Sequence, residues 1–445
     1  MNLRYLLATA TLAIPVAGLP TTSSNHSPQI YYAPHGTRGI VVPSFSAVVP
    51  ISDTVINLVQ ENTRSVSHES WELGVMSEAY LEIEWPQMSV YGYEGVPPPR
   101  SVTNNNNTDN ITSILEIANY VIAIRPEGID TLIDDSSVGD PASVGVALLM
   151  ANWTKASRPD EALNDYNTPL IDELNYLLYD APRTDDGAIS HRSEQVQLWS
   201  DFVYMVPPFL AYYGALNQPY VSDGLLYDAY LQISLYRNYL YDATPGLWRH
   251  VALGQWQDIG YWSTGNGWAA AGMLRVLMTM NQTSLGTLGQ FAAAQIDLQN
   301  WATDIVNNVW TYQQPSGCLL NYATDTTTFE DSSSTALLAS VTYRLAALPV
   351  FLRGASVNAT INPTVQSTYS GPLNPLTSLS ATALNSAHKA RDCVKANLND
   401  SGWLNNVVNP YDFSTEGDQS AEGQSFVLLM EAAWRAWFDY AQEQG

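Results

Sequence analysis

Cysteine and positive charge are scarce in this sequence. Two cysteines, Cys318 and Cys393, stand among 445 residues, so disulfides cannot be the main source of stability. The sequence is compatible with a disulfide between the two cysteines and equally with two free buried thiols. The 18 Lys and Arg residues against 43 Asp and Glu residues leave a net charge of −25. This charge argues against a nucleic-acid partner, whose phosphates would be repelled, and indicates an acidic working medium.

Uninterrupted apolar runs of membrane-spanning length are also lacking. Residues 1–18 have a short positive start, an apolar run from Leu6 to Val16 and small residues up to Gly18, which is typical of a secretory signal peptide. We therefore expect a secreted, extracellular protein without a membrane partner, with one domain over residues 19–445. Asn-X-Ser/Thr sequons agree with that route and lie at Asn25, Asn106, Asn110, Asn152, Asn281, Asn358 and Asn399.

Metal and phosphate motifs are missing from the sequence as well. The six histidines include no His-X-X-X-His pair and are not joined by a cysteine cluster. No Gly-rich phosphate loop stands between a strand and a helix. We predict that the protein uses no metal and no other cofactor.

What the chain has instead is one theme repeated six times: a loop rich in Gly, Asp or Ser leads into an apolar helix of small and aromatic residues. These segments are Ser70–Met76, Ser143–Leu149, Trp199–Leu210, Gly265–Leu277, Asp331–Leu337 and Ser420–Val427. Amphipathic helical stretches precede them, most clearly Thr112–Ile124, Pro169–Tyr179, Gly224–Tyr241, Ala292–Tyr312 and Ala381–Leu398. Helices that are apolar on every side belong inside a protein, and one-sided helices belong outside.

Six outer–inner pairs predict an all-α fold, an (α/α)6 barrel of six helical hairpins. An open helical solenoid is the alternative, but solenoid repeats are shorter and more regular in length. In a closed barrel the inner helices all start at the same end, so the residues that precede them converge. At or just before these starts lie Asp140, His191, Asp201, His250 and Trp262.

Two of the segments have unusual chemistry. Asp201 is a lone acid in the aromatic and apolar stretch Trp199–Phe209, where partial desolvation favours the neutral, proton-donating form of a carboxyl group. In Trp262-Ser-Thr-Gly-Asn-Gly-Trp268, two tryptophans bracket a Gly-Asn-Gly turn, as in the wall of a sugar site. Taken alone, either segment is equally compatible with a buried aromatic helix start.

Taken together, the motifs resemble those of the six-hairpin glycosidases, specifically the unsaturated rhamnogalacturonyl hydrolases of the secreted fungal type. Trp199-Ser-Asp201, followed by Tyr204-Met205, resembles the family's catalytic-aspartate motif. The segment Trp262–Trp268 resembles its Trp-Gly-Arg-Gly-Asn-Gly-Trp motif. Asp140, with a glycine five residues on, matches the spacing of the family's second active-site Asp.

The resemblance implies a role for each site residue. Asp201 would be the single acid/base, and Asp140 would be a supporting acid, although Asp134 or Asp135 could take that place and Asp140 could instead be a helix N-cap. The implied substrate-binding set combines histidines, ring-stacking tryptophans and polar side chains. Its members are Trp71, His191, Arg192, Trp199, Arg249, His250, Trp262, Asn266 and Trp268.

One position departs from the family pattern. Thr264 stands where the family motif has Arg, and threonine cannot offer a rigid fork to a carboxylate. Arg192 or Arg249, each next to a candidate histidine, could supply the missing cation. The alternative is that the sugar specificity has changed.

The resemblance also implies the reaction. The substrate would be an oligosaccharide left by a polysaccharide lyase, with a 4,5-unsaturated uronic acid at its non-reducing end, and the enzyme would hydrate the vinyl ether. One alternative is an inverting glycosidase that uses Asp140 and Asp201 as a carboxylate pair. Another is a carbohydrate-binding barrel without activity. We expect the oligosaccharide to be the partner and the protein to be a monomer.

Overall fold

The inner helices of the fold consist of the apolar segments that the sequence marks out. The computed structural model describes residues 49–100, 111–155, 164–216, 222–287, 290–352 and 376–444. Six inner helices run from the start of each apolar segment: α2 (Ser70–Glu84), α5 (Gly145–Thr154) with the short α4 (Asp140–Ser143) before it, α7 (Phe202–Leu216), α9 (Ser263–Gln282), α12 (Ser332–Leu352) and α14 (Ala421–Gln444). Every residue of α7 is buried, as expected for an inner helix.

An outer helix precedes each inner one. The outer helices are α1 (Asp53–Val66), α3 (Thr112–Ile124), α6 (Asn167–Asn175) continued by η4 (Tyr176–Asp180), α8 (Ser222–Leu240), α11 (Ala292–Val309) and α13 (Ala381–Asn397). The predicted range Thr112–Ile124 coincides with α3, and the other four ranges agree within a few residues. Helix α1 has no predicted range from the sequence pattern, and it buries only Ile56, Val59 and Thr63 along one stripe.

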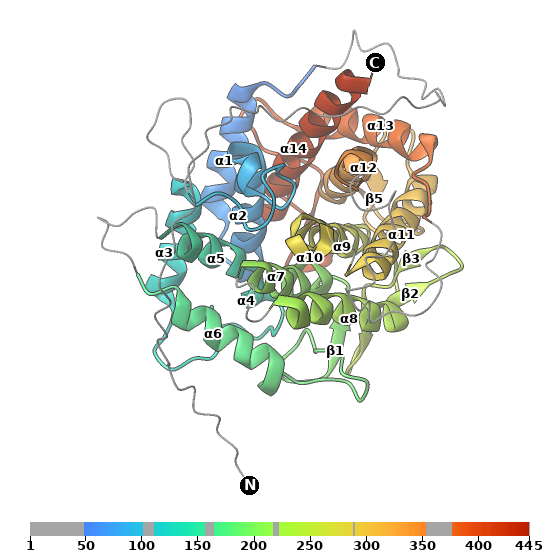
Figure 1. The fold of residues 1–445 in the computed structure, drawn as a ribbon. Coiled ribbons are helices and arrows are strands. Elements are labelled where there is room, and N and C mark those ends of the chain that lie inside the picture. The colour runs from blue at the N-terminus through green and yellow to red at the C-terminus, as the bar shows by residue number, and fades with distance from the viewer. Residues whose placement is uncertain are drawn as a thin grey trace, which may run out of the picture. The chain divides into compact units, whose positions relative to one another are not determined.

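The inner helices form a closed ring. Each packs against the next one along the chain, and α14 returns to pack against α2 and α1, so the first and last hairpins meet (Figure 1). This closure confirms the (α/α)6 barrel and excludes the open solenoid. Among the described residues, no helix is both long and apolar enough to cross a bilayer.

Helices α7 and α9 approach each other unusually closely. A Cβ atom on Gly272 of α9 would lie 2.1 Å from the Val203 carbonyl oxygen of α7, so only glycine fits there. Pro207 has no N–H to donate to that carbonyl four residues earlier, and the helix tolerates the proline at this contact. The close approach brings the residues before α7 next to those before α9.

Short antiparallel strand pairs hold the loops before the inner helices. Strand β1 (Gln197–Trp199) pairs with β4 (Val251–Leu253), and Trp199 lies opposite Val251. The other pairs are β2 (Tyr241–Asp242) with β3 (Leu247–Trp248), β5 (Leu319–Leu320) with β6 (Glu330–Asp331), and β7 (Val407–Asn409) with β8 (Asp412–Gly417). In the described part of the chain each sheet has two strands, in line with the sparse strand pattern of the sequence.

The two cysteines are joined, which settles the alternative left open by the sequence. Cys318 and Cys393, 75 residues apart, form a disulfide that ties the loop before β5 to α13. Of the sequons, Asn399 is exposed, whereas Asn281 in the last turn of α9 is only 6% exposed. The predicted signal peptide and the sequons at Asn25, Asn106, Asn110 and Asn358 lie outside the described residues.

Candidate active site

A cavity of about 200 Å³ lies where the inner helices start. Nine of the eleven residues assigned from the sequence line it: Trp71, Asp140, His191, Arg192, Trp199, Asp201, His250, Trp262 and Trp268. Five further residues complete the lining: Met205, Pro410, Tyr411, Phe413 and Glu422. Side chains from loops that are far apart in the sequence therefore converge, as the closed barrel predicts.

Asp201 ends a line of three side chains. Its Oδ2 atom lies 3.6 Å from Nε2 of His250, and Nδ1 of His250 lies 2.9 Å from Oδ2 of Asp258. Burial alone would raise the pKa of Asp258. Hydrogen bonds from His250 and Tyr322 lower this pKa below its ordinary value. Asp258 is thus a carboxylate that accepts a hydrogen bond from Nδ1–H of His250, which leaves Nε2 of His250 facing Asp201. The backbone helps to join the two residues, since Ser200 N donates to the His250 carbonyl at 2.9 Å.

Asp140 and His191 form a second pair, 3.7 Å apart between Oδ1 and Nε2. Burial, reinforced by the charge of Asp201, raises the pKa of Asp140 to about 7. Burial lowers the pKa of His191 to about 4. At mildly acidic pH both groups are therefore neutral, and their contact is not a salt bridge.

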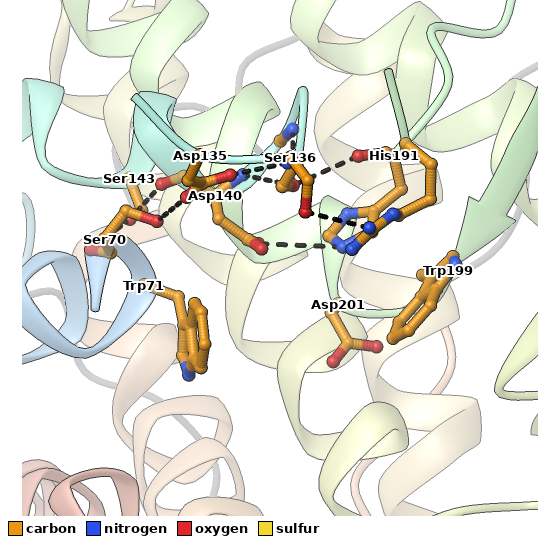
Figure 2. Close-up of polar contacts among 12 residues, drawn as sticks. Ser70, Trp71, Asp135, Ser136, Asp140, Ser143, His191, Trp199 and Asp201 are labelled. Carbon is orange, nitrogen blue, oxygen red and sulfur yellow. Dashed lines mark hydrogen bonds and ion pairs between the residues drawn. The ribbon is translucent and has the colours of Figure 1, made fainter. Parts of the chain in front are cut away.

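The structure distinguishes Asp140 from its neighbours in sequence. Asp140 is the first residue of α4, and the N-cap position is occupied by Gly139, so the N-cap alternative fails. Asp135 accepts a hydrogen bond from Ser70 Oγ at 2.5 Å, and neither Asp134 nor Asp135 lines the cavity. In Figure 2 the Asp140 and Asp201 carboxyl groups lie between the rings of Trp71 and Trp199.

Aromatic rings make up the cavity wall around the acids. Trp199 stacks on His191 with centroids 4.9 Å apart and meets His250 edge-on at 5.3 Å. Phe413, from the β7–β8 hairpin, meets His250 edge-on at 4.6 Å. Such a wall offers flat apolar faces with few polar groups between them, which suits the C–H faces of a sugar.

Glu422 is a site residue that the sequence analysis missed. It lies in the first turn of α14, where its Oε1 accepts a hydrogen bond from Trp71 Nε1 at 2.7 Å. Burial, followed by the charges of Glu72 and Asp201, raises the pKa of Glu422 well above its ordinary value. The sequence contains one indication of this role: Glu422 is an acid at the start of Ser420–Val427, a segment whose pattern predicts the start of an inner helix. Tyr411 and Phe413 had no such signal, because they lie on a loop hairpin.

Two assigned residues lie outside the cavity lining. Asn266 is completely buried, and its amide accepts from Trp248 N at 2.8 Å and donates to the carbonyls of Trp248 and Trp262. It therefore braces the wall from behind, a correction to its placement in the substrate-binding set. The side chain of Arg249 points to Asp242 and not into the cavity, with Nη2 and Oδ2 2.6 Å apart.

Arg192 is the cation that reaches the cavity. Its Nη2 donates to Ser136 Oγ at 2.9 Å, and its Nε lies 3.2 Å from Glu194. Thr264, at the family's Arg position, is completely buried beside Asp331. In the described parts of the chain, no group of three or more His, Cys, Asp or Glu side chains is arranged to hold a metal ion.

The ring of six helical hairpins with an acid-bearing aromatic cavity is the architecture of the six-hairpin glycosidases. Residues 135–349 match the family model described as Glycosyl Hydrolase Family 88. The matched segment is a little under half of the chain, and together with the shared helical fold it identifies the protein as a glycoside hydrolase. No curated protein matches the sequence.

Solved structures share the fold at low sequence identity. A possible member of the GH105 family from Salmonella enterica is 15% identical, with a TM-score of 0.62, over 88% of this chain and 95% of that one. A family 88 glycosyl hydrolase from Bacteroides vulgatus is 14% identical, with a TM-score of 0.56, over 86% and 98%. A structure of UGL with dGlcA-Glc-Rha-Glc is 12% identical, with a TM-score of 0.52, over 86% and 94%.

Proposed function

We propose that the protein removes a 4,5-unsaturated uronic acid from the non-reducing end of oligosaccharides that polysaccharide lyases produce from rhamnogalacturonan or pectin. The observation that carries the proposal is the placement of Asp201, which lies in an aromatic cavity with His250 at 3.6 Å. Further support comes from the match of residues 135–349 to the family 88 model and from the similar fold of UGL, whose bound sugar begins with dGlcA.

In the proposed reaction Asp201 acts twice. Its carboxyl proton goes to C4 of the vinyl ether, and the positive charge that forms at C5 is stabilised by the ring oxygen. Water then adds at C5 and returns one proton to the Asp201 carboxylate. The hemiketal that results opens, the C1–O bond breaks, and the leaving sugar departs as an alcohol. One acid is enough, so no second carboxylate at a matched distance is required.

The neighbouring groups would orient this chemistry. His250, held by Asp258, presents Nε2 toward Asp201 and would hold the attacking water there. The neutral carboxyl group of Asp140 can donate a hydrogen bond to a sugar hydroxyl, which a carboxylate cannot do. Arg192 would bind the uronate carboxylate, because Arg249 is paired with Asp242 away from the cavity.

A second candidate is a conventional inverting glycosidase with Asp140 as the general acid. The pKa of about 7 for Asp140 favours it, because an inverting acid must hold its proton near the working pH. In that reaction a saturated sugar would be as good a substrate as an unsaturated one.

The decisive experiment compares saturated and unsaturated disaccharides of the same sugars with the purified protein. The proposal expects product release from the unsaturated compound together with loss of the ultraviolet absorbance of its double bond. Release from the saturated compound at a comparable rate, or release with the double bond kept, would instead support the inverting candidate.

We also propose that the protein is secreted. Its disulfide supports this, because structural disulfides persist mainly in oxidising compartments. Expression in a secreting fungal host with the native N-terminus should give the protein in the medium without residues 1–18. Retention of an uncleaved chain inside the cells would contradict the proposal.

A further inference from the structure

Trp256 extends the aromatic wall of the cavity to the outside of the molecule. It lies on the loop between β4 and α9, and 43% of it is exposed. Its ring meets Trp199 edge-on at 5.4 Å and lies nearly parallel to Phe413, at 22° and 6.4 Å. Since Trp199 and Phe413 both line the cavity, the three rings form one continuous aromatic surface from the cavity to the solvent.

The loop that presents Trp256 is held in place by hydrogen bonds with two glutamine side chains, Gln197 and Gln195. Gln197, which is completely buried, donates from Nε2 to the Trp256 carbonyl at 2.7 Å and accepts from Trp199 Nε1 at 2.9 Å. Gln195 accepts from Gln255 N at 2.7 Å. One side chain therefore fixes both tryptophans, and a ligand that stacks on Trp256 would lose little free energy in ordering the loop.

The size of the cavity indicates where a second sugar must lie. A volume of about 200 Å³ is below the roughly 300–1,000 Å³ of sites that enclose drug-sized ligands. It is enough for the terminal ring only, so the next ring has to be bound at the rim. At that rim Trp256 is flanked by two exposed, uncharged amide side chains, Gln255 and Gln257.

We propose that Trp256, Gln255 and Gln257 form an outer subsite that binds the neutral sugar attached to the terminal uronic acid. The indole would stack on the C–H face of this leaving sugar, and the two amides would exchange hydrogen bonds with its hydroxyl groups. The proposal rests on the function proposed above.

The test compares two substrates that differ only in the leaving group: the methyl glycoside of the 4,5-unsaturated uronic acid, and the unsaturated disaccharide. In Trp256→Ala, kcat/KM for the disaccharide should fall about tenfold. The value for the methyl glycoside should stay within about twofold of wild type, because that substrate does not reach the rim. Trp256→Phe should recover most of the disaccharide activity, since a ring remains. The matched control is Tyr227→Ala, which removes an aromatic residue of similar exposure (50%) from the outer helix α8.

The outcomes separate this inference from the proposed function. Equal losses on both substrates in Trp256→Ala, in a variant that melts like wild type, would mean that Trp256 only supports Trp199, and would overturn the outer subsite. Unchanged disaccharide kinetics in both Trp256 variants would overturn it as well. If the wild-type protein consumes neither substrate, the proposed function itself fails, and the subsite falls with it.

Discussion

At the scale of single residues, environment assigns different tasks to the acids that line the cavity and to Asp258, which lies behind His250. Hydrogen bonds from His250 and Tyr322 lower the pKa of Asp258, whereas burial raises the pKa of Asp140 to about 7 and that of Glu422 well above its ordinary value. Among the acids of the described residues, Asp201 alone has its carboxyl group opposite the free Nε2 of His250. The site thus combines one carboxylate behind the cavity that orients His250, two buried acids whose pKa is raised, and one acid placed for proton transfer.

Asp201→Asn should remove turnover of the unsaturated disaccharide while leaving the fold intact. The amide has the shape of the acid but cannot deliver a proton to C4, and such groups contribute about a hundredfold to ten-thousandfold in rate. The measurement is kcat together with the melting temperature, which should stay near the wild-type value. A variant that keeps activity within about tenfold of wild type would remove Asp201 from the acid/base role.

Arg192→Gln and Arg249→Gln form a matched pair, because each arginine stands next to a site histidine. Arg192→Gln should raise KM for an unsaturated uronate about ten- to a hundredfold, since it loses a charge-assisted bond to the carboxylate. Arg249→Gln should leave KM nearly unchanged, because Arg249 is bound to Asp242. The uronamide analogue, which has no negative charge, should respond little to either change. Equal effects of the two substitutions on the uronate would contradict this division.

At the scale of elements, the contact between α7 and α9 positions the site. The loop before α7 places Asp201 and the loop before α9 places Trp262, so the spacing of these helices sets the spacing of the two residues. Gly272 permits that spacing, and Asn266 fixes the start of α9 to the Trp248 backbone with two hydrogen bonds. A change in this contact should therefore alter catalysis without touching a cavity residue.

Gly272→Ala should be destabilising and should lower kcat. Its Cβ would lie 2.1 Å from the Val203 carbonyl oxygen, so α7 and α9 have to separate. Overpacking of this kind costs about 1–3 kcal/mol of unfolding free energy. The control is Gly224→Ala in the outer helix α8, whose Cβ would meet nothing within 4 Å and which should be stabilising by about 0.4–1 kcal/mol. Urea unfolding of both variants measures the difference, and a neutral Gly272→Ala would show that the two helices can move apart freely.

At the scale of the whole molecule, buried acids make stability depend on pH. Burial raises the pKa of Asp135 to about 6, of Asp140 and Glu78 to about 7, and of Glu173 to about 8. In the unfolded chain these groups titrate near 4. Between roughly pH 4 and pH 8 the folded protein therefore binds more protons than the unfolded one, and stability falls as pH rises. His191 and His388, whose pKa values are lowered by burial, act in the opposite direction below about pH 6.5.

The melting temperature should therefore be higher at pH 5 than at pH 8, by on the order of 5 °C. The net charge of −25 acts in the same direction, since each carboxyl group that ionises adds to the repulsion. Glu173→Gln, on α6 and outside the cavity, should stabilise the protein at pH 8 and reduce the pH dependence, while Glu116→Gln on the exposed face of α3 should not. A melting temperature that rises from pH 5 to pH 8 would contradict this account.

The sequence by itself determined the architecture and pointed to Asp201 among the acids that line the cavity. Apolar segments such as Trp199–Leu210 alternate with one-sided helices such as Thr112–Ile124, and this pattern depends only on which faces must avoid water. Asp201 was identifiable because its aromatic neighbours are adjacent in the chain. The same local reading identified Asp140, His191 and His250, because each lies at or just before the start of an inner helix.

Only the tertiary structure decided which side chains meet in the cavity. Trp71 and Glu422 form a hydrogen bond across 351 residues of sequence, because the ring of helices closes between α2 and α14. Arg192 and Arg249 look equivalent in sequence, yet one faces the cavity and the other faces Asp242. Asn266 looks like a site residue, yet it points back into the protein backbone. The direction of a side chain depends on strand register, helix rotation and distant partners, and residue spacing along the chain does not contain that information.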